Sequence, residues 1–271
     1  MKIKAVLLSV FIVLFSLLPA VSVSASETVL AEGISDTAEV LLFAPYGSTS
    51  VFAYNDTKTY ILKANGSASC TTAYPASHVF LCGETVTSVS PMEDLTVVER
   101  LNAASLSRTD LIGVDLPADD ILDLDADRFG RLYAVRNSEP DVLRIFGEDG
   151  SLAGTITCPV NILRIQVLDD TLYLFLPEQC LQIALGQNLP QAYTKSFSYT
   201  NAAVPFCMLN ASVYVSTNGT VYTTAGAALT TTGHYALRET ALASGSDALF
   251  WADDEGTVFR YSYSGANTAY C

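Results

Sequence analysis

The residues best suited to chemistry form an acidic stretch between positions 115 and 127. This stretch holds six aspartates, and Asp123, Asp125 and Asp127 alternate with other residues near its end. Alternate positions of a strand share one face, and Ca²⁺ prefers carboxylate oxygens, so these three residues are the metal-ligand candidates. The EF-hand pattern is not met, because Gly130 is displaced and no Glu closes the loop. We favour the other interpretation, a turn beside an acidic strand face that lines a water-filled channel without a ligand.

The two histidines are the other residues whose chemistry could be catalytic. His78 and His234 lie far apart, and either one could act as a general base. A histidine in a Ser/Thr/Gly-rich loop, such as the one at 231–234, is more commonly solvated. The chain has no nucleophile elbow, nucleotide-binding loop or zinc-protease motif. We therefore predict no catalytic residue.

Six cysteines follow the N-terminal region, and an even number in an exported protein favours disulfide bonds. They are Cys70, Cys82, Cys158, Cys180, Cys207 and Cys271. Cys70 and Cys82 are closest in sequence, so their loop is the easiest to close, although six cysteines allow about fifteen pairings. A cysteine in an apolar run, such as Cys207, can instead be a small buried side chain. No spacing of these residues matches a zinc site.

The N-terminal 25 residues have the pattern of a secretory signal peptide. Lys2 and Lys4 precede an apolar run from Ala5 to Leu18, and Val23-Ser-Ala25 supplies small residues before a cleavage site. The alternative is an uncleaved anchor, but the apolar run is shorter than the roughly 20 residues that a spanning helix needs. We expect a secreted or cell-envelope protein that is not inserted in the membrane after cleavage.

The charge of the mature chain disfavours two classes of partner. Removing Lys2 and Lys4 lowers the 14 basic side chains to 12, so that against 28 acidic ones the formal charge is −16. Nucleic acids and anionic lipids are bound largely through Lys and Arg, and neither is expected here. High net charge also keeps an exported protein soluble.

An apolar–aromatic pair, or its equivalent, recurs at the centre of short strand-like runs. Its copies are Val51-Phe52, Leu132-Tyr133, Leu172-Tyr173, Val213-Tyr214 and Leu249-Phe250. The aromatic positions are 81, 40, 41 and 36 residues apart, and a degraded copy around Glu84–Ser90 divides the first interval. A strand-built period of about 40 to 45 residues is typical of propeller blades. A β-sandwich, the structural alternative, predicts no such repeat.

The clearest repeat unit lies between Asp120 and Cys158. Strand patterns at 121–126, 132–135, 142–146 and 152–157 are separated by turn residues that include Gly130 and Gly150. The best helical run, Met92–Leu106, has a β-prone centre. We therefore predict an all-β propeller of about six four-stranded antiparallel blades, as one domain over residues 26–271 after the signal peptide at 1–25.

The motif Asp125-Ala-Asp-Arg-Phe-Gly-Arg-Leu-Tyr-Ala-Val135, followed by a strand and Asp149-Gly150, resembles the repeat of NHL-type and gluconolactonase-like six-bladed propellers. The resemblance implies a scaffold and carries no activity of its own. Enzymatic members of that group hold a divalent metal at the mouth of the central channel. The residues that periodicity places along this channel are Asp123, Asp125, Arg164, Gln166 and Glu239.

We expect an exported, non-enzymatic binding or interaction module whose ligand is a protein, peptide or glycan. One alternative is a metal-dependent hydrolase or lyase with its site in the central channel. Another is an ectodomain fragment of a larger cell-envelope protein. We predict no cofactor, and Ca²⁺ is the alternative.

Overall fold

The chain folds into six four-stranded antiparallel sheets, each built from four consecutive strands. The computed structural model describes residues 39–63, 65–200, 203–231, 243–244, 248–252, 258–262 and 267–269. The signal-peptide region, His234, Glu239 and Cys271 lie outside the described residues. In the sixth sheet the backbone strands alone are described. The predicted all-β propeller of four-stranded blades is confirmed.

The first three blades contain the degraded repeat and the clearest one. Blade 1 consists of β1 (Glu39–Tyr46), β2 (Thr49–Asn55), β3 (Thr59–Lys63) and β4 (Ser69–Thr71). Blade 2 consists of β5 (His78–Cys82), β6 (Thr85–Pro91), β7 (Thr96–Asn102) and β8 (Arg108–Val114). The short 3₁₀ helix η1 (Ala118–Asp120) precedes blade 3, which consists of β9 (Ile121–Ala126), β10 (Leu132–Arg136), β11 (Val142–Phe146) and β12 (Leu152–Thr157).

The last three blades repeat the same order of strands. Blade 4 consists of β13 (Arg164–Leu168), β14 (Thr171–Phe175), β15 (Gln179–Ala184) and β16 (Thr194–Ser198). Blade 5 consists of β17 (Pro205–Asn210), β18 (Val213–Ser216), β19 (Thr220–Thr223) and β20 (Ala228–Thr231). Blade 6 consists of β21 (Ala243–Ser244), β22 (Ala248–Ala252), β23 (Val258–Ser262) and β24 (Asn267–Ala269).

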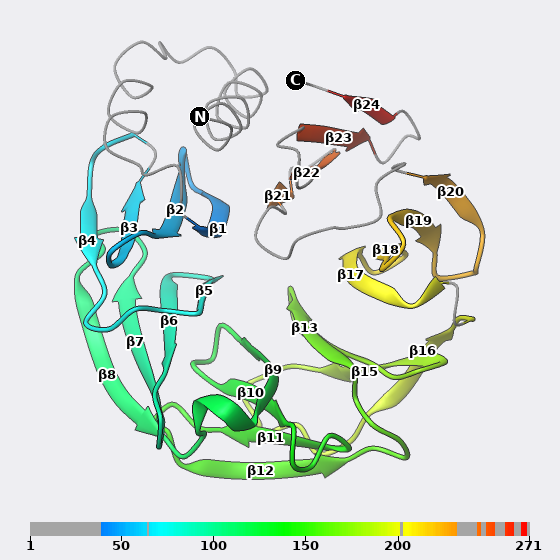
Figure 1. Cartoon of the computed structure of the whole chain (residues 1–271), viewed down its shortest axis with the longest axis horizontal. Coiled ribbons are helices and arrows are strands. Elements are labelled where there is room, and N and C mark those ends of the chain that lie inside the picture. The colour runs from blue at the N-terminus through cyan, green and yellow to red at the C-terminus, as the bar shows by residue number, and fades with distance from the viewer. Residues whose placement is uncertain are drawn as a thin grey trace.

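The first strand of each blade lies nearest the centre of a ring (Figure 1). Contacts join β1 to β5, β5 to β9, β9 to β13 and β13 to β17, and β1 also meets β21. Within the described residues no helix is both long and apolar enough to cross a membrane.

The apolar core lies between neighbouring blades. Separate clusters join blades 1 and 2, blades 2 and 3, blades 3 and 4, and blades 4 and 5. The aromatic residue of the recurring pair is buried wherever its side chain is described, namely at Phe52, Tyr133, Tyr173 and Tyr214. Burial of large apolar surface between sheets is the main force that assembles the ring. The pair therefore packs the blades together, as its spacing indicates.

Residues with positive φ end several strands, and the sequence pattern assigns one of them, Gly130, to a turn. Gly130 and Gly219 have φ values of 77° in the turns after β9 and β18, and Asp169 has a φ of 53° after β13. Left-handed conformations are readily adopted by Gly and tolerated by Asp, so these residues fix the hairpins. The centre of the Met92–Leu106 run forms β7, because neighbouring β-branched residues favour a strand.

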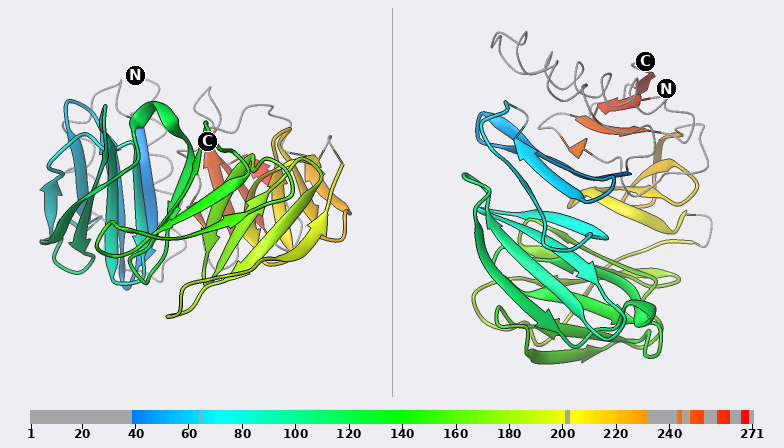
Figure 2. Two further views of the ribbon diagram at one scale, coloured as in Figure 1. Left: turned by 90° about the horizontal axis from the view of Figure 1, so that it is seen from below. Right: turned by 60° about the vertical axis from the view of Figure 1, so that its left-hand side comes forward.

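In blades 2 to 4 the connections between strands lie on two opposite faces of the ring (Figure 2). One face carries the turns between first and second strands and those between third and fourth strands. The other carries the turns between second and third strands and the linkers that lead into the next blade. These two faces differ in their side chains, as described below.

Candidate functional site

Asp123 and Asp125 hold blade 3 to blade 4 by hydrogen bonds. Both lie on β9, and the backbone N–H of Ile165 donates to Oδ2 of Asp123 while that of Val167 donates to Oδ2 of Asp125, each at 2.7 Å. β13 is the edge strand of blade 4 and pairs only with β14, so the two carboxyl groups bond to backbone N–H groups on its unpaired edge. Bonding to an ionised acceptor makes such contacts stronger than ordinary ones. The acidic strand face is directed at a neighbouring strand.

Gln166 repeats this contact one blade later. Its Oε1 accepts a hydrogen bond from the backbone N–H of Met208 at 2.6 Å, and its Nε2 donates to the Met208 carbonyl at 3.2 Å. All three side chains reach a residue 42 positions further along the chain. This step matches the repeat length. Polar residues of the innermost strands therefore connect successive blades.

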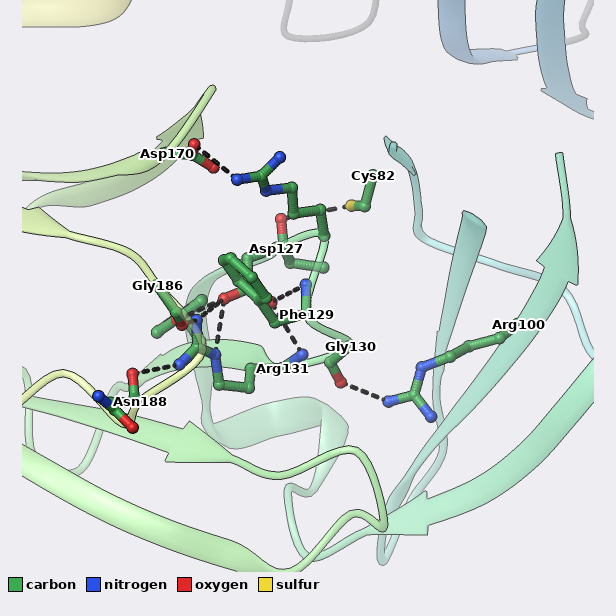
Figure 3. Close-up of polar contacts among 12 residues, drawn as sticks. Cys82, Arg100, Asp127, Phe129, Gly130, Arg131, Asp170, Gly186 and Asn188 are labelled. Carbon is green, nitrogen blue, oxygen red and sulfur yellow. Dashed lines mark hydrogen bonds and ion pairs between the residues drawn. The ribbon is translucent and has the colours of Figure 1, made fainter. Parts of the chain in front are cut away.

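Asp127 is part of a buried ion pair at the turn after β9 (Figure 3). Its Oδ2 accepts hydrogen bonds from Nε of Arg131 and the hydroxyl of Tyr133, both at 2.7 Å. Its Oδ1 accepts from the backbone N–H groups of Phe129 and Arg131. The carboxylate is therefore fully satisfied inside the protein, which is the condition for a stable buried charge.

Buried arginines reach from one blade to the turns of the next. Arg131 donates through Nη1 to the carbonyl of Asn188 at 2.9 Å and through Nη2 to that of Gly186 at 2.7 Å, both in blade 4. Arg100 of blade 2 likewise donates to the carbonyl of Gly130 in blade 3 at 2.6 Å. The guanidinium fork suits such multiple bonding. Figure 3 shows the contacts of both arginines.

The three metal-ligand candidates therefore have separate partners. Asp123 and Asp125 bond to β13, whereas Asp127 bonds to its own turn and Arg131. In the described part of the chain, no group of three or more His, Cys, Asp or Glu side chains is arranged to hold a metal ion. The Ca²⁺ alternative receives no support from these contacts.

Asp125 differs from an ordinary carboxyl in its acidity. Burial raises its pKa to about 7, and the nearby Asp123 acts in the same direction. The N–H groups of Val167 and Ala126 and the charge of Arg164 lower the pKa, but by less than burial raises it. The seam between blades 3 and 4 therefore contains a group that titrates near neutral pH.

Asp125→Asn should remove a pH dependence of stability. The ordinary pKa of Asp is about 4 in an unfolded chain, so between pH 4 and the folded value of about 7 the folded state binds more protons. The free energy of unfolding contributed by Asp125 is therefore present at low pH and lost as pH rises. Between about pH 5 and about pH 8, the free energy of unfolding measured in urea should fall more for the wild type than for Asp125→Asn. Equal losses in the two proteins would contradict the assignment.

His78 begins β5 and faces its neighbours in blade 2. Its Nδ1 lies 2.8 Å from the hydroxyl oxygen of Ser77, and its ring stacks on Phe80 at a centroid distance of 6.0 Å. A hydroxyl beside an imidazole is one element of a nucleophile–base pair, which also needs an orienting group and an oxyanion site. These contacts do not by themselves build a catalytic site.

The predicted disulfide framework is absent from the described part of the chain. The five described cysteines are free thiols. Cys70 lies on β4, the outer strand of blade 1, whereas Cys82 ends β5, the innermost strand of blade 2. Sγ of Cys82 instead lies 3.4 Å from the carbonyl oxygen of Ala126. The nearest cysteines in sequence are therefore separated by the width of a blade.

The described cysteines act as small apolar side chains. Cys82, Cys158, Cys180 and Cys207 are buried, as the alternative interpretation of Cys207 requires. Burial raises the pKa of Cys158 to about 11 and that of Cys207 to about 12, so both remain protonated thiols at neutral pH. Protonated thiols are poor nucleophiles and metal ligands.

The face of the ring that carries the turns between second and third strands and the linkers contains five segments around blades 2 and 3. We call residues 72–77, 92–95, 115–122, 137–141 and 158–163 the linker face. The backbone N–H of Ala118 donates to the carbonyl of Met92 at 3.0 Å, and the side chain of Asn137 donates to the carbonyl of Asp119 at 3.2 Å. These bonds connect the turn of blade 2 to the linker and the linker to the turn of blade 3.

Hydrogen bonds also fix the first and last segments of the linker face, 72–77 and 158–163. The backbone N–H of Ile162 donates to the carbonyl of Pro140 at 2.7 Å, and the hydroxyl of Ser90 donates to the carbonyl of Tyr74 at 3.2 Å. All five segments are thus fixed to one another or to a strand end. The linker face is a preformed surface.

Large apolar side chains are exposed on the linker face. It carries Tyr74, Met92, Leu95, Leu122, Val160 and Leu163, which are six of the nine exposed large hydrophobic residues in the described part of the chain. Single exposed apolar residues are common, so it is the presence of six of them on one side of the ring that makes this side the candidate interaction surface. Sequence reasoning did not identify this surface. The one available signal was the presence of Met, Leu and Val in turn segments, where polar residues are usual.

Comparisons with known proteins support the fold alone. No protein-family model and no curated protein matches the chain. A computationally designed protein, Ika8, is similar in structure with a TM-score of 0.50 and 12% identity, over 82% of this chain and 70% of that one. BamB from Moraxella catarrhalis gives a TM-score of 0.42 at 12% identity, over 84% and 75% of the two chains. A KlHsv2 variant with loop 6CD replaced by a Gly-Ser linker gives 0.39 at 13% identity, over 56% and 58%.

Proposed function

We propose that this chain is an exported, non-enzymatic binding module that holds its partner on the linker face. One observation carries the proposal: six of the nine exposed large apolar side chains in the described part of the chain lie on the segments of this face. Water contact with such side chains is unfavourable, and a partner that covers them gains about 25 cal/mol for each Å² of apolar surface removed from water. Export is part of the proposal because residues 1–25 have the pattern of a signal peptide.

The hydrogen-bonded backbone of the linker face supports this role. The contacts between Ala118 and Met92 and between Ile162 and Pro140 fix the segments before a partner arrives. Binding to a preformed surface avoids the entropic cost of ordering loops. Propellers are built as rigid scaffolds whose loops differ between blades, and this arrangement suits a recognition surface.

The relationship to NHL-type propellers is part of the same proposal. In blade 3 the turn between Asp127 and Gly130 precedes the buried Leu132-Tyr133 pair, and Gly150 follows β11 with a φ of 81°. This is the order of features in the repeat of that group. The repeat supplies the scaffold, so the relationship is compatible with binding and does not require catalysis.

Replacing exposed leucines on the linker face should abolish ligand binding. The mature chain would be presented with a displayed random-peptide library and a glycan array, and recovered ligands would be titrated against variants. Leu95 and Leu122 are each 39% exposed, so each is also partly buried, and urea unfolding of Leu95→Ser/Leu122→Ser must show a folded protein before its binding is measured. If each buried leucine contributes about 1 kcal/mol of binding energy, affinity should fall about tenfold or more.

The matched control is a leucine on the opposite face. Leu152 is 56% exposed at the start of β12, beside the turn between the third and fourth strands of blade 3. Leu152→Ser should leave ligand affinity within about twofold of the wild type, which is less than 0.5 kcal/mol. Recovery of no ligand from either library, or equal binding by both variants, would refute the use of the linker face.

A further inference from the structure

The linker face is acidic as well as apolar. It contains seven carboxylates and no Lys, Arg or His. The acids are Glu93, Asp94, Asp115, Asp119, Asp120, Glu139 and Asp141. Turns on the opposite side of the same blades also contain acids, but they include Arg128 and Arg131 as well. The five segments of the linker face therefore carry charge of one sign, with Arg136 directly beside them and bonded to the carbonyl of Asp115.

Two of these carboxylates have cations beside them. Arg136 lies 3.6 Å from Asp120, and Arg144 pairs with Glu139. Glu93, Asp94, Asp115 and Asp119 are exposed, and no salt bridge to them occurs among the described residues. These four side chains are therefore open to solvent.

The acids and the apolar residues alternate over the same short segments. Glu93 and Asp94 lie between Met92 and Leu95 in the turn of blade 2, and Asp119 lies three residues before Leu122. The hydrogen bond between Ala118 and Met92 joins these two segments. A partner that covers Met92, Leu95 and Leu122 must therefore place groups next to several carboxylates, and uncompensated anions there would weaken binding.

We infer that the occupant of the linker face is a protein segment in which Lys or Arg residues alternate with large apolar side chains. This inference rests on the proposed function and adds the chemistry of the partner. Charge complementarity selects the cations, and the exposed Met, Leu, Val and Tyr side chains select the apolar groups. An anionic lipid surface would be repelled, and a neutral glycan would leave the carboxylates uncompensated.

The test uses a short peptide in which Lys and Leu alternate, titrated calorimetrically into the mature chain. A matched peptide has Glu in place of Lys. The Lys peptide should bind about tenfold or more tightly than the Glu peptide, and the preference should weaken in high salt, because exposed charges are screened. Equal affinities of the two peptides would overturn the inference.

A pair of variants separates the linker face from general attraction to an acidic protein. Glu93→Lys on the linker face and Glu148→Lys on the opposite face change the net charge equally, and both residues are exposed. Glu93→Lys should lower the affinity for the Lys peptide about fivefold, whereas Glu148→Lys should change that affinity less than twofold. The difference between the two variants measures the local charge contact at position 93. Equal losses in the two variants would show that net charge alone attracts the peptide.

The outcomes also distinguish this inference from the proposed function. If library ligands still depend on Leu95 and Leu122 while the Lys peptide shows no preference over the Glu peptide, the partner chemistry is wrong and the binding surface stands. If Leu95→Ser/Leu122→Ser retains every ligand, including the Lys peptide, the proposed function is wrong and the inference fails with it.

Discussion

Arg131→Met should destabilise the folded chain by about 3–5 kcal/mol, because it leaves the carboxylate of Asp127 buried without its cation. The side chains of Arg131 and Asp127 are 7% and 1% exposed, and their closest approach is 2.6 Å. The same change removes the hydrogen bonds to the carbonyls of Gly186 and Asn188 in blade 4. Urea denaturation followed by circular dichroism measures the loss, which is a large part of the stability of a typical domain.

The neighbouring Arg128 supplies the control. It also pairs with an aspartate of blade 4, Asp170, at 2.8 Å, but the two side chains are 54% and 51% exposed. An exposed pair contributes about 0–1 kcal/mol, so Arg128→Met should have little effect. If Arg131→Met costs no more than Arg128→Met, the buried network does not hold blades 3 and 4 together.

A double variant isolates the pair itself. In Asp127→Asn/Arg131→Met the buried charge is gone, so we expect the double variant to be less destabilised than the sum of the two single variants by roughly 1–3 kcal/mol. Additive losses would show that Arg131 acts through packing on Phe129 and Tyr133, whose rings lie 4.9 and 6.0 Å from the guanidinium carbon.

Local sequence signals were sufficient to predict the strands of blade 3. Alternation of apolar and polar residues defined β9, and Gly130 and Gly150 marked turns that adopt positive φ. These features act within a few residues, so they can be recognised without knowledge of the tertiary structure. The repeat spacing then supplied the number of blades, because each unit must bury its faces against its neighbours.

Contacts between blades were not predictable in the same way. The alternation in β9 placed Asp123 and Asp125 on one face, but not their bonds to Ile165 and Val167, which depend on the register of β9 against β13. The cysteines show the same limit, because Cys70 and Cys82 are close in sequence but lie on outer and inner strands of different blades.

The linker face was missed for a related reason. Met92 and Leu95 could have been core residues by their type, and their exposure is set by how the turn of blade 2 meets the linker before blade 3. Apolar residues in a turn are informative once the turn is known to face solvent. Sequence composition gave the overall acidity, whereas the absence of basic residues from five separate segments emerges when they are brought together by the fold.

Gly150→Ala should destabilise the chain by about 2–5 kcal/mol, through two separate effects. Gly150 has a φ of 81°, and a left-handed conformation costs about 1–2 kcal/mol for an L-residue. A Cβ there would also lie 2.6 Å from the carbonyl oxygen of Gly113 in β8, so the turn of blade 3 would have to move away from blade 2. Such overpacking against backbone typically costs about 1–3 kcal/mol.

Gly47→Ala separates the two effects, since Gly47 has a φ of 58° but no atom within 4 Å of an added Cβ. This variant retains the conformational cost and lacks the clash, so we expect a loss of about 1 kcal/mol in the free energy of unfolding. The difference between the two glycine variants then measures how tightly the blade 3 turn packs on blade 2. Because that packing excludes any side chain at position 150, equal losses in the two variants would mean that blades 2 and 3 can separate at this edge at little cost.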